Sequence, residues 1–144
     1  MRTVIANYDE RNCILIGRSS GAVVMTRMAA LHTRNVLGVV AIGYPFRHPV
    51  RGDEPYRASH LPRLRCPTLI FQGDQDEYGD AEHGRSYPAS PEILIEGISG
   101  THGYHLSAAG WRAIGERLTR FIEHCRQAAP AAGGASPVPA LATS

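Results

Sequence analysis

The chain has 144 residues, 43% of them hydrophobic and 19% charged, which is the composition of one ordinary globular domain. Its formal net charge is only +2 and no basic stripe interleaved with aromatic residues occurs, so nucleic-acid binding is not expected. No apolar run approaches the ~20 residues that span a bilayer, and no leader-like segment opens the sequence, so neither membrane insertion nor secretion is expected.

Four apolar runs predict β-strands. They cover Cys13–Ile16, Val36–Ile42, Thr68–Phe71 and Glu92–Ile95. The runs are continuous rather than alternating, which is typical of a parallel sheet covered on both faces. The predicted fold class is therefore α/β, with about four parallel strands flanked by helices.

Two stretches predict helices. Residues Ala22–Leu31 form the first, with an apolar stripe of Val24, Met28 and Leu31. The second covers Ala108–Cys125 and has apolar residues at three- and four-residue steps, at Trp111, Ile114, Leu118, Phe121 and Ile122. Residues 128–144 are almost entirely Ala, Gly, Pro and Ser, so we expect one domain over 1–127 followed by a disordered tail.

The polar stretch Gly43–Leu64 separates the second and third predicted strands. Its length fits a lid over a site, a short helical excursion or a solvated connector.

The chain has three cysteines, Cys13, Cys66 and Cys125. They are odd in number and widely separated, which predicts reduced thiols in a cytoplasmic protein. With no metal-ligand spacing and no phosphate-binding glycine motif, we expect neither a metal nor another cofactor.

The pentapeptide Gly17-Arg18-Ser19-Ser20-Gly21 has the pattern G-x-S-x-G between a predicted strand and a predicted helix. In that context the serine sits on a tight turn with its hydroxyl pushed out above the sheet, where it can act as a nucleophile. We expect both flanking glycines to be required, because a side chain at either would collide with the strand or the helix. The N–H groups that open the helix, that of Ser20 first, point at the same space and can stabilise an oxyanion.

A serine nucleophile needs a base, and the base needs an acid that fixes its tautomer. The third predicted strand ends in an acid-rich turn, from which we choose Asp76 as the acid, with Asp74 as the alternative. A loop after the fourth strand carries the base, for which we choose His102, with His105 as the alternative. The order serine, acid, histidine at successive strand ends is typical of a doubly wound hydrolase.

These residues resemble the α/β-hydrolase superfamily. Beyond the pentapeptide, the matching stretches are Gly43-Tyr44-Pro45-Phe46, His60-Leu61-Pro62 and Cys66 to Gly73 leading into Asp74-Gln75-Asp76. They resemble in particular the dienelactone-hydrolase-like branch that includes the hydrolase-like subunit 3 of the NSL histone-acetyltransferase complex and bacterial relatives. The resemblance implies Ser19 as nucleophile, Asp76 as acid and His102 as base.

The family fold has eight strands, and the elbow follows the fifth. The resemblance therefore implies an N-terminally shortened member that retains the last four strands and lacks a second oxyanion donor. The strand before Ser19 would then be a bare apolar edge, which invites pairing with a second copy or a partner chain.

These residues are compatible with two functions. The first is a serine hydrolase that cleaves a small ester, thioester or lactone through an acyl-enzyme. The alternative is an interaction module of the same fold with impaired catalysis. The sequence does not identify the acyl group, the leaving group or the oligomeric state.

Overall fold

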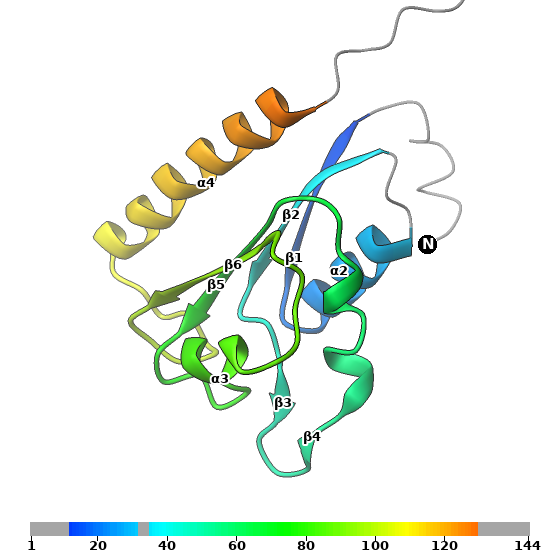
Figure 1. The fold of residues 1–144 in the computed structure, drawn as a ribbon. Coiled ribbons are helices and arrows are strands. Elements are labelled where there is room, and N and C mark those ends of the chain that lie inside the picture. Colours follow the sequence, from blue (N-terminus) through cyan, green and yellow to red (C-terminus); the bar gives the residue numbers. More distant parts are fainter. Residues whose placement is uncertain (1–11, 32–34, 130–144) are drawn as a thin grey trace, which may run out of the picture.

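A parallel sheet is the centre of the fold. The computed structural model describes residues 12–31 and 35–129, and within them four strands pair in the order β1-β2-β5-β6, each parallel to its neighbours (Figure 1). Their bounds are β1 (Cys13–Arg18), β2 (Val36–Ile42), β5 (Thr68–Gly73) and β6 (Ile93–Ile98). The predicted α/β class and parallel sheet are confirmed, and β1, β5 and β6 continue past their predicted ends.

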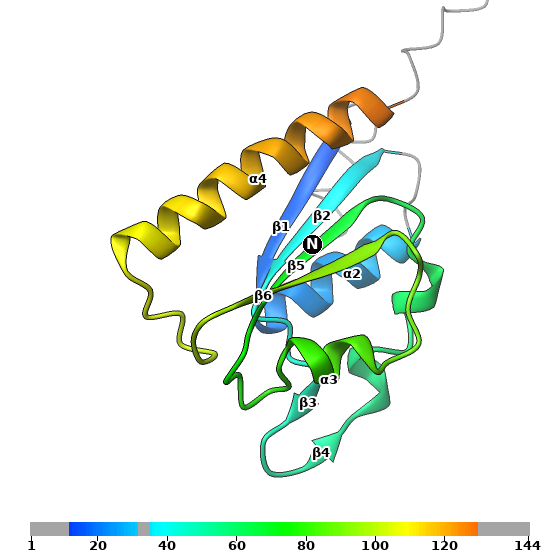
Figure 2. The ribbon, with the colours of Figure 1, turned by 60° about the vertical axis from the view of Figure 1, so that its left-hand side comes forward.

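Helices cover both faces of this sheet. Helix α2 (Ser20–Leu31) and the short α3 (Ala81–Arg85) lie on one face, and α4 (Ala108–Ala128) lies on the other (Figure 2). Neighbouring side chains of β2 enter two different buried clusters, since Val39 packs on the α2 side and Val40 on the α4 side. Because both faces are buried, apolar residues are needed at successive positions of each strand.

The helix after the first strand packs with small side chains. The predicted stripe is wrong here, since Val24 is 36% exposed and Leu31 is 74% exposed. The buried side chains of α2 are Ala22, Val23, Thr26 and Ala29. Small side chains suit the start of this helix, because its backbone lies against Gly17 of β1.

Helix α4 contacts the opposite face through the predicted apolar residues Ile114 and Phe121, together with Cys125. Trp111, which the periodicity predicts on the same face, is 45% exposed. The helix comes closest to β2 at Gly38, where a Cβ atom would lie 2.5 Å from Cys125 Sγ and 3.2 Å from the Pro67 carbonyl oxygen. Glycine is therefore the residue that permits this helix to pack against β2.

We predict that Gly38→Ala lowers the free energy of unfolding by about 1–3 kcal/mol, because the added methyl group overfills the contact with Cys125. The matched control is Gly115→Ala in α4, where a Cβ atom meets nothing within 4 Å. That change is expected to stabilise the protein by up to ~1 kcal/mol through helix propensity. Urea unfolding of both variants checks the prediction, and equal effects would contradict it.

The segment between β2 and β5 is a short folded excursion. A small antiparallel pair, β3 (Arg47–His48) and β4 (Gly52–Asp53), is followed by the 3₁₀ turns η1 (Pro55–Arg57) and η2 (Leu61–Arg63). Leu61 is part of the buried cluster beneath α2. Of the three interpretations offered by the sequence, the helical excursion fits best. Helix α3, between β5 and β6, has no counterpart among the predicted elements.

A buried histidine joins this excursion to helix α2. His60 is 3% exposed, and its Nε2 lies 2.8 Å from Thr26 Oγ1. Thr26 Oγ1 is also within 2.9 Å of the Ala22 carbonyl oxygen, to which it donates its hydrogen. The hydroxyl is then the acceptor for His60 Nε2–H, which leaves His60 Nδ1 as an unprotonated atom without a hydrogen-bond partner among the described residues.

This environment opposes a positive charge on the ring. Burial, and next the positive charges of Arg27 and Arg63, lower the pKa of His60 to about 4. In the unfolded chain the same ring titrates near ~6.5, so between these two values the unfolded chain binds the proton more readily. His60 therefore contributes stability that is fully present above pH ~6.5 and is lost as the pH falls through 4.

We predict that His60→Gln, which keeps an N–H donor but cannot titrate, weakens the dependence of stability on pH between ~6.5 and 4. The wild type should lose up to about 3 kcal/mol more than the variant over this interval. Urea midpoints measured at several pH values give the difference. Parallel curves for the two proteins would show that His60 is protonated equally in both states.

Strand β1 lies at one edge of the four-stranded sheet and pairs with β2 alone among residues 12–31 and 35–129. The edge predicted for the strand before Ser19 is therefore present in this part of the chain.

Most of the predicted tail lies outside the described residues, and α4 continues past its predicted end at Cys125. None of the described helices is long and apolar enough to cross a membrane.

Candidate active site

The turn between β1 and α2 has the geometry expected of a nucleophile elbow. Ser19 has a φ of 51°, in the left-handed region that non-glycine residues rarely adopt. Its N–H donates to the Ile42 carbonyl oxygen at 3.1 Å, and its own carbonyl accepts from Ala22 N–H at 2.9 Å. These bonds attach the strained residue to β2 on one side and to α2 on the other.

The two glycines of the motif have different importance. A Cβ atom on Gly17 would lie 2.6 Å from the Gly21 carbonyl oxygen and 2.8 Å from Ala22 Cα, both of them backbone atoms that cannot move away cheaply. A Cβ atom on Gly21 would meet nothing within 4 Å. The expectation that both positions require glycine is therefore correct for Gly17 and wrong for Gly21, because the backbone of α2 lies against a Cβ position on Gly17 while a Cβ position on Gly21 faces open space.

We predict that Gly17→Ala destabilises the protein by more than ~2 kcal/mol and displaces Ser19, since α2 must move away from β1. Gly21→Ala is the matched control in the same motif, and its stability should stay within ~1 kcal/mol of the wild type. Thermal unfolding compares the two variants. Comparable losses would mean that the close approach at Gly17 does not shape the turn.

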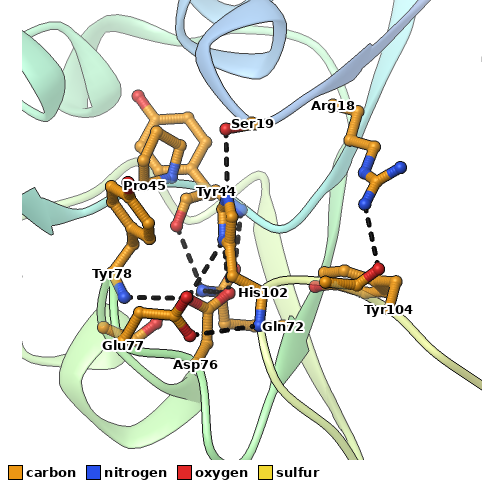
Figure 3. A network of polar contacts seen from close by, with 12 residues as sticks. Arg18, Ser19, Tyr44, Pro45, Gln72, Asp76, Glu77, Tyr78, His102 and Tyr104 are labelled. Atoms are coloured by element: carbon orange, nitrogen blue, oxygen red, sulfur yellow. Dashed lines mark hydrogen bonds and ion pairs between the residues drawn. The ribbon is translucent and has the colours of Figure 1, made fainter.

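Ser19, His102 and Asp76 come from three different strand ends and meet at one edge of the sheet. Ser19 Oγ lies 2.8 Å from His102 Nε2. On the far side of the ring, His102 Nδ1 lies 3.0 Å from Asp76 Oδ1 and 2.9 Å from Asp76 Oδ2 (Figure 3). All four strands are parallel, so their carboxyl ends share this edge, and residues far apart in sequence become neighbours.

The contacts of His102 assign its protons. Because Nδ1 faces a carboxylate, it carries the hydrogen of the neutral ring, and Nε2 is left free to accept the Ser19 hydroxyl proton. The Asp76 side chain is completely buried, whereas that of His102 is 14% exposed. The Tyr78 N–H also donates to Asp76 Oδ1 at 2.8 Å. The carboxylate thus points at the ring and cannot be reached by solvent.

The alternative acid and base lie elsewhere. Asp74 Oδ1 accepts from Gly100 N–H at 2.8 Å, so this carboxylate joins the turn after β5 to the loop that carries His102. The exposed His105 lines a cavity between β6 and α4, together with Leu106 and Arg117. Neither side chain has a described contact with Ser19.

The loop that carries His102 is anchored by residues that the sequence analysis did not identify. Tyr104 has a φ of 55° and donates its hydroxyl hydrogen to the Phe71 carbonyl oxygen at 2.8 Å. Burial, and next the charge of Asp76, raise the pKa of Tyr104, so the hydroxyl stays a donor. Arg18 Nη2 donates to the Gly103 carbonyl oxygen at 3.1 Å. The elbow and β5 therefore both hold this loop.

An aromatic ring covers the base. The centroids of the Tyr78 and His102 rings lie 4.4 Å apart with an interplanar angle of 37°. The Tyr78 ring therefore packs against the imidazole that contacts Ser19. A backbone donor lies next to Ser19 in the chain. Ser20 is the first residue of α2, and the N–H groups of a first helical turn have no acceptor within the helix, so the Ser20 N–H is available to a ligand.

The arrangement supplies a hydroxyl, a base oriented by a buried acid, and a backbone donor beside them. No group of three or more His, Cys, Asp or Glu side chains able to hold a metal ion occurs in the part of the chain that the structure describes.

The family follows from a comparison with known domains. A family model described as "Alpha/beta hydrolase domain" matches residues 1–129. The chain belongs to the α/β-hydrolase family. No curated protein matches it at a significant level.

Solved structures of esterases and of a lipase share this fold. An esterase from Pyrococcus furiosus is 14% identical with a TM-score of 0.66, and the match covers 87% of this chain and 58% of the esterase. A monoacylglycerol lipase from Paleococcus ferrophilus is 15% identical with a TM-score of 0.63, over 85% of this chain and 74% of the lipase. The esterase domain of a Rhodothermus marinus protein is 18% identical with a TM-score of 0.63, over 85% and 64%. At these identities the likeness shows the fold, and the chain spans little more than half of the first of these structures.

Proposed function

We propose that this α/β-hydrolase cleaves a small ester, thioester or lactone through a serine acyl-enzyme. The observation that carries the proposal is the unbroken series of contacts from Ser19 Oγ through the His102 ring to the buried Asp76 carboxylate. Nucleophile, base and acid lie within hydrogen-bond distance, which is the geometry that proton transfer requires.

In the proposed reaction, Ser19 Oγ attacks the acyl carbonyl carbon while its proton passes to His102 Nε2. Asp76 accepts the hydrogen on Nδ1 and stabilises the imidazolium that forms. The Ser20 N–H donates to the oxyanion of the tetrahedral intermediate. His102 then gives the proton to the leaving oxygen or sulfur, and a water molecule activated by the same base releases the acyl group and restores the Ser19 hydroxyl.

The structural neighbours support the reaction class. Two of them are described as esterases and one as a monoacylglycerol lipase, which suggests an oxygen ester for this chain as well. Because the chain covers 58% of the first neighbour, the activity of that whole protein is carried over only as a proposal. Membership of the dienelactone-hydrolase-like branch stays a prediction from the sequence motifs.

We predict that a fluorophosphonate probe labels the wild-type protein and that Ser19→Ala abolishes labelling, because the probe forms its bond with an activated serine oxygen. Ser20→Ala is the matched control, since it removes the neighbouring hydroxyl but keeps the backbone N–H. Gel fluorescence and the mass of the labelled peptide report the outcome. A Ser19→Ala protein that is still labelled would remove Ser19 from the mechanism.

The alternative function is an interaction module. The unpaired edge of β1 among the described residues favours it, because an open strand edge can add a strand from another chain. This function predicts a stoichiometric complex that Ser19→Ala leaves intact, together with no labelling of the wild-type protein. Size-exclusion chromatography with light scattering tests the complex with a second copy.

A further inference from the structure

Gln72 is a polar side chain in the centre of the fold. It is the penultimate residue of β5, it is completely buried, and it comes directly after the apolar residues Leu69, Ile70 and Phe71. A buried amide costs free energy unless its hydrogen-bonding atoms have partners. The partners of Gln72 lead directly to the candidate active site, because one of them is the carboxylate of Asp76.

The hydrogen bonds of Gln72 fix the orientation of its amide. Oε1 accepts from the Tyr44 N–H at 2.8 Å. Nε2 carries two hydrogens and shares them among three acceptors, namely Asp76 Oδ2 at 3.1 Å, the Tyr44 carbonyl oxygen at 3.0 Å and the carbonyl oxygen of Gly79. The opposite orientation would turn an oxygen toward three other oxygens, so only the assigned one is compatible with the surroundings.

This amide completes the hydrogen bonding of the Asp76 carboxylate. A fully buried carboxylate stays ionised only if donors replace the water that it has lost. Asp76 has three such donors, namely His102 Nδ1, the Tyr78 N–H and Gln72 Nε2. Figure 3 shows the Gln72 side chain against Asp76, beneath the ring of His102. Gln72 is the side-chain donor that adds no charge and is not itself part of the proton transfer.

We propose that Gln72 is a positioning residue for the hydrolase reaction, which keeps the Asp76 carboxylate aimed at His102 Nδ1 and compensates part of its negative charge. The inference rests on the proposed function of Ser19, His102 and Asp76. The same amide also binds Tyr44, just after β2, and Gly79, in the turn after β5. A loss of activity alone would therefore not separate the positioning of Asp76 from a merely structural role.

The pH dependence of the reaction separates the two roles. Fluorophosphonate labelling requires His102 in its unprotonated form. Without the Gln72 donor, the negative charge of Asp76 is less compensated and holds a protonated His102 more strongly. The acid limb of the labelling rate should then move to higher pH. Other titratable or charged groups near His102 or Asp76 in the described part of the chain include Glu77, Tyr78, Arg18 and Tyr104, and they are unchanged in the variants.

The experiment measures the labelling rate against pH for Gln72→Met, which has a similar length and no donor. We expect a rate about 10–100-fold below the wild type near neutral pH, the effect of one hydrogen bond to a charged group. The acid limb should lie at higher pH than in the wild type. Thr68→Val is the control, since it removes another buried polar group of β5 whose bond goes to the Cys66 carbonyl oxygen. It should leave the pH profile unchanged.

A second variant covers the case in which Gln72→Met does not fold. Gln72→Glu has nearly the same shape but can donate to Asp76 only when protonated, so its rate relative to the wild type should increase as the pH falls. Folded variants with the pH profile of the wild type would overturn the inference for Gln72 alone. A wild-type protein that is not labelled at Ser19 would overturn the proposed function instead.

Discussion

The close contact of helix α2 with strand β1 at Gly17 is the constraint on which the site depends. With less than 3 Å between a Cβ position on Gly17 and the backbone of the helix, no other residue allows the turn to close. This turn holds Ser19 at a positive φ and directs its hydroxyl away from the sheet. The small residue Ala22 belongs to the same close contact, since its Cα would lie 2.8 Å from a Cβ atom on Gly17.

A second constraint is the burial of an ionisable carboxylate. In the proposed reaction Asp76 orients His102 from a position that solvent does not reach, yet burial by itself favours the neutral form of a carboxylate. Donors from three sources replace the lost water: the His102 ring, a backbone N–H and a strand amide. The polar residues Gln72 and Tyr78 thereby serve the same group from different elements.

Much of this arrangement could be predicted from sequence. Continuous apolar runs identify the parallel strands, and the order of Ser19, Asp76 and His102 after three of them reflects the shared carboxyl edge. The distinction between Asp74 and Asp76 could not be predicted with certainty, because both come after the same strand and both accept hydrogen bonds. It depends on the direction in which the turn carries each side chain.

Other features depend on distances that a single sequence does not contain. The stripe of Val24 and Leu31 has helical periodicity, but the helix buries the side that carries Ala22, Thr26 and Ala29 instead, and periodicity alone does not show which side faces the sheet. Gly21 resembles Gly17 in the motif, although only Gly17 lies against backbone. A glutamine after an apolar strand was a visible signal for Gln72, and its significance emerges only once Tyr44 and Asp76 are seen to be its partners.

The anchoring of the histidine loop has a consequence for how such a domain can diversify. Asp74 and Tyr104 attach this loop to β5 and its adjoining turn on either side of His102, before the chain reaches α4. These anchors of the His102 loop do not involve the C-terminal helix. We therefore expect that evolution or a protein engineer can lengthen α4, replace its outer surface or fuse another module behind it without moving His102 away from Ser19 and Asp76.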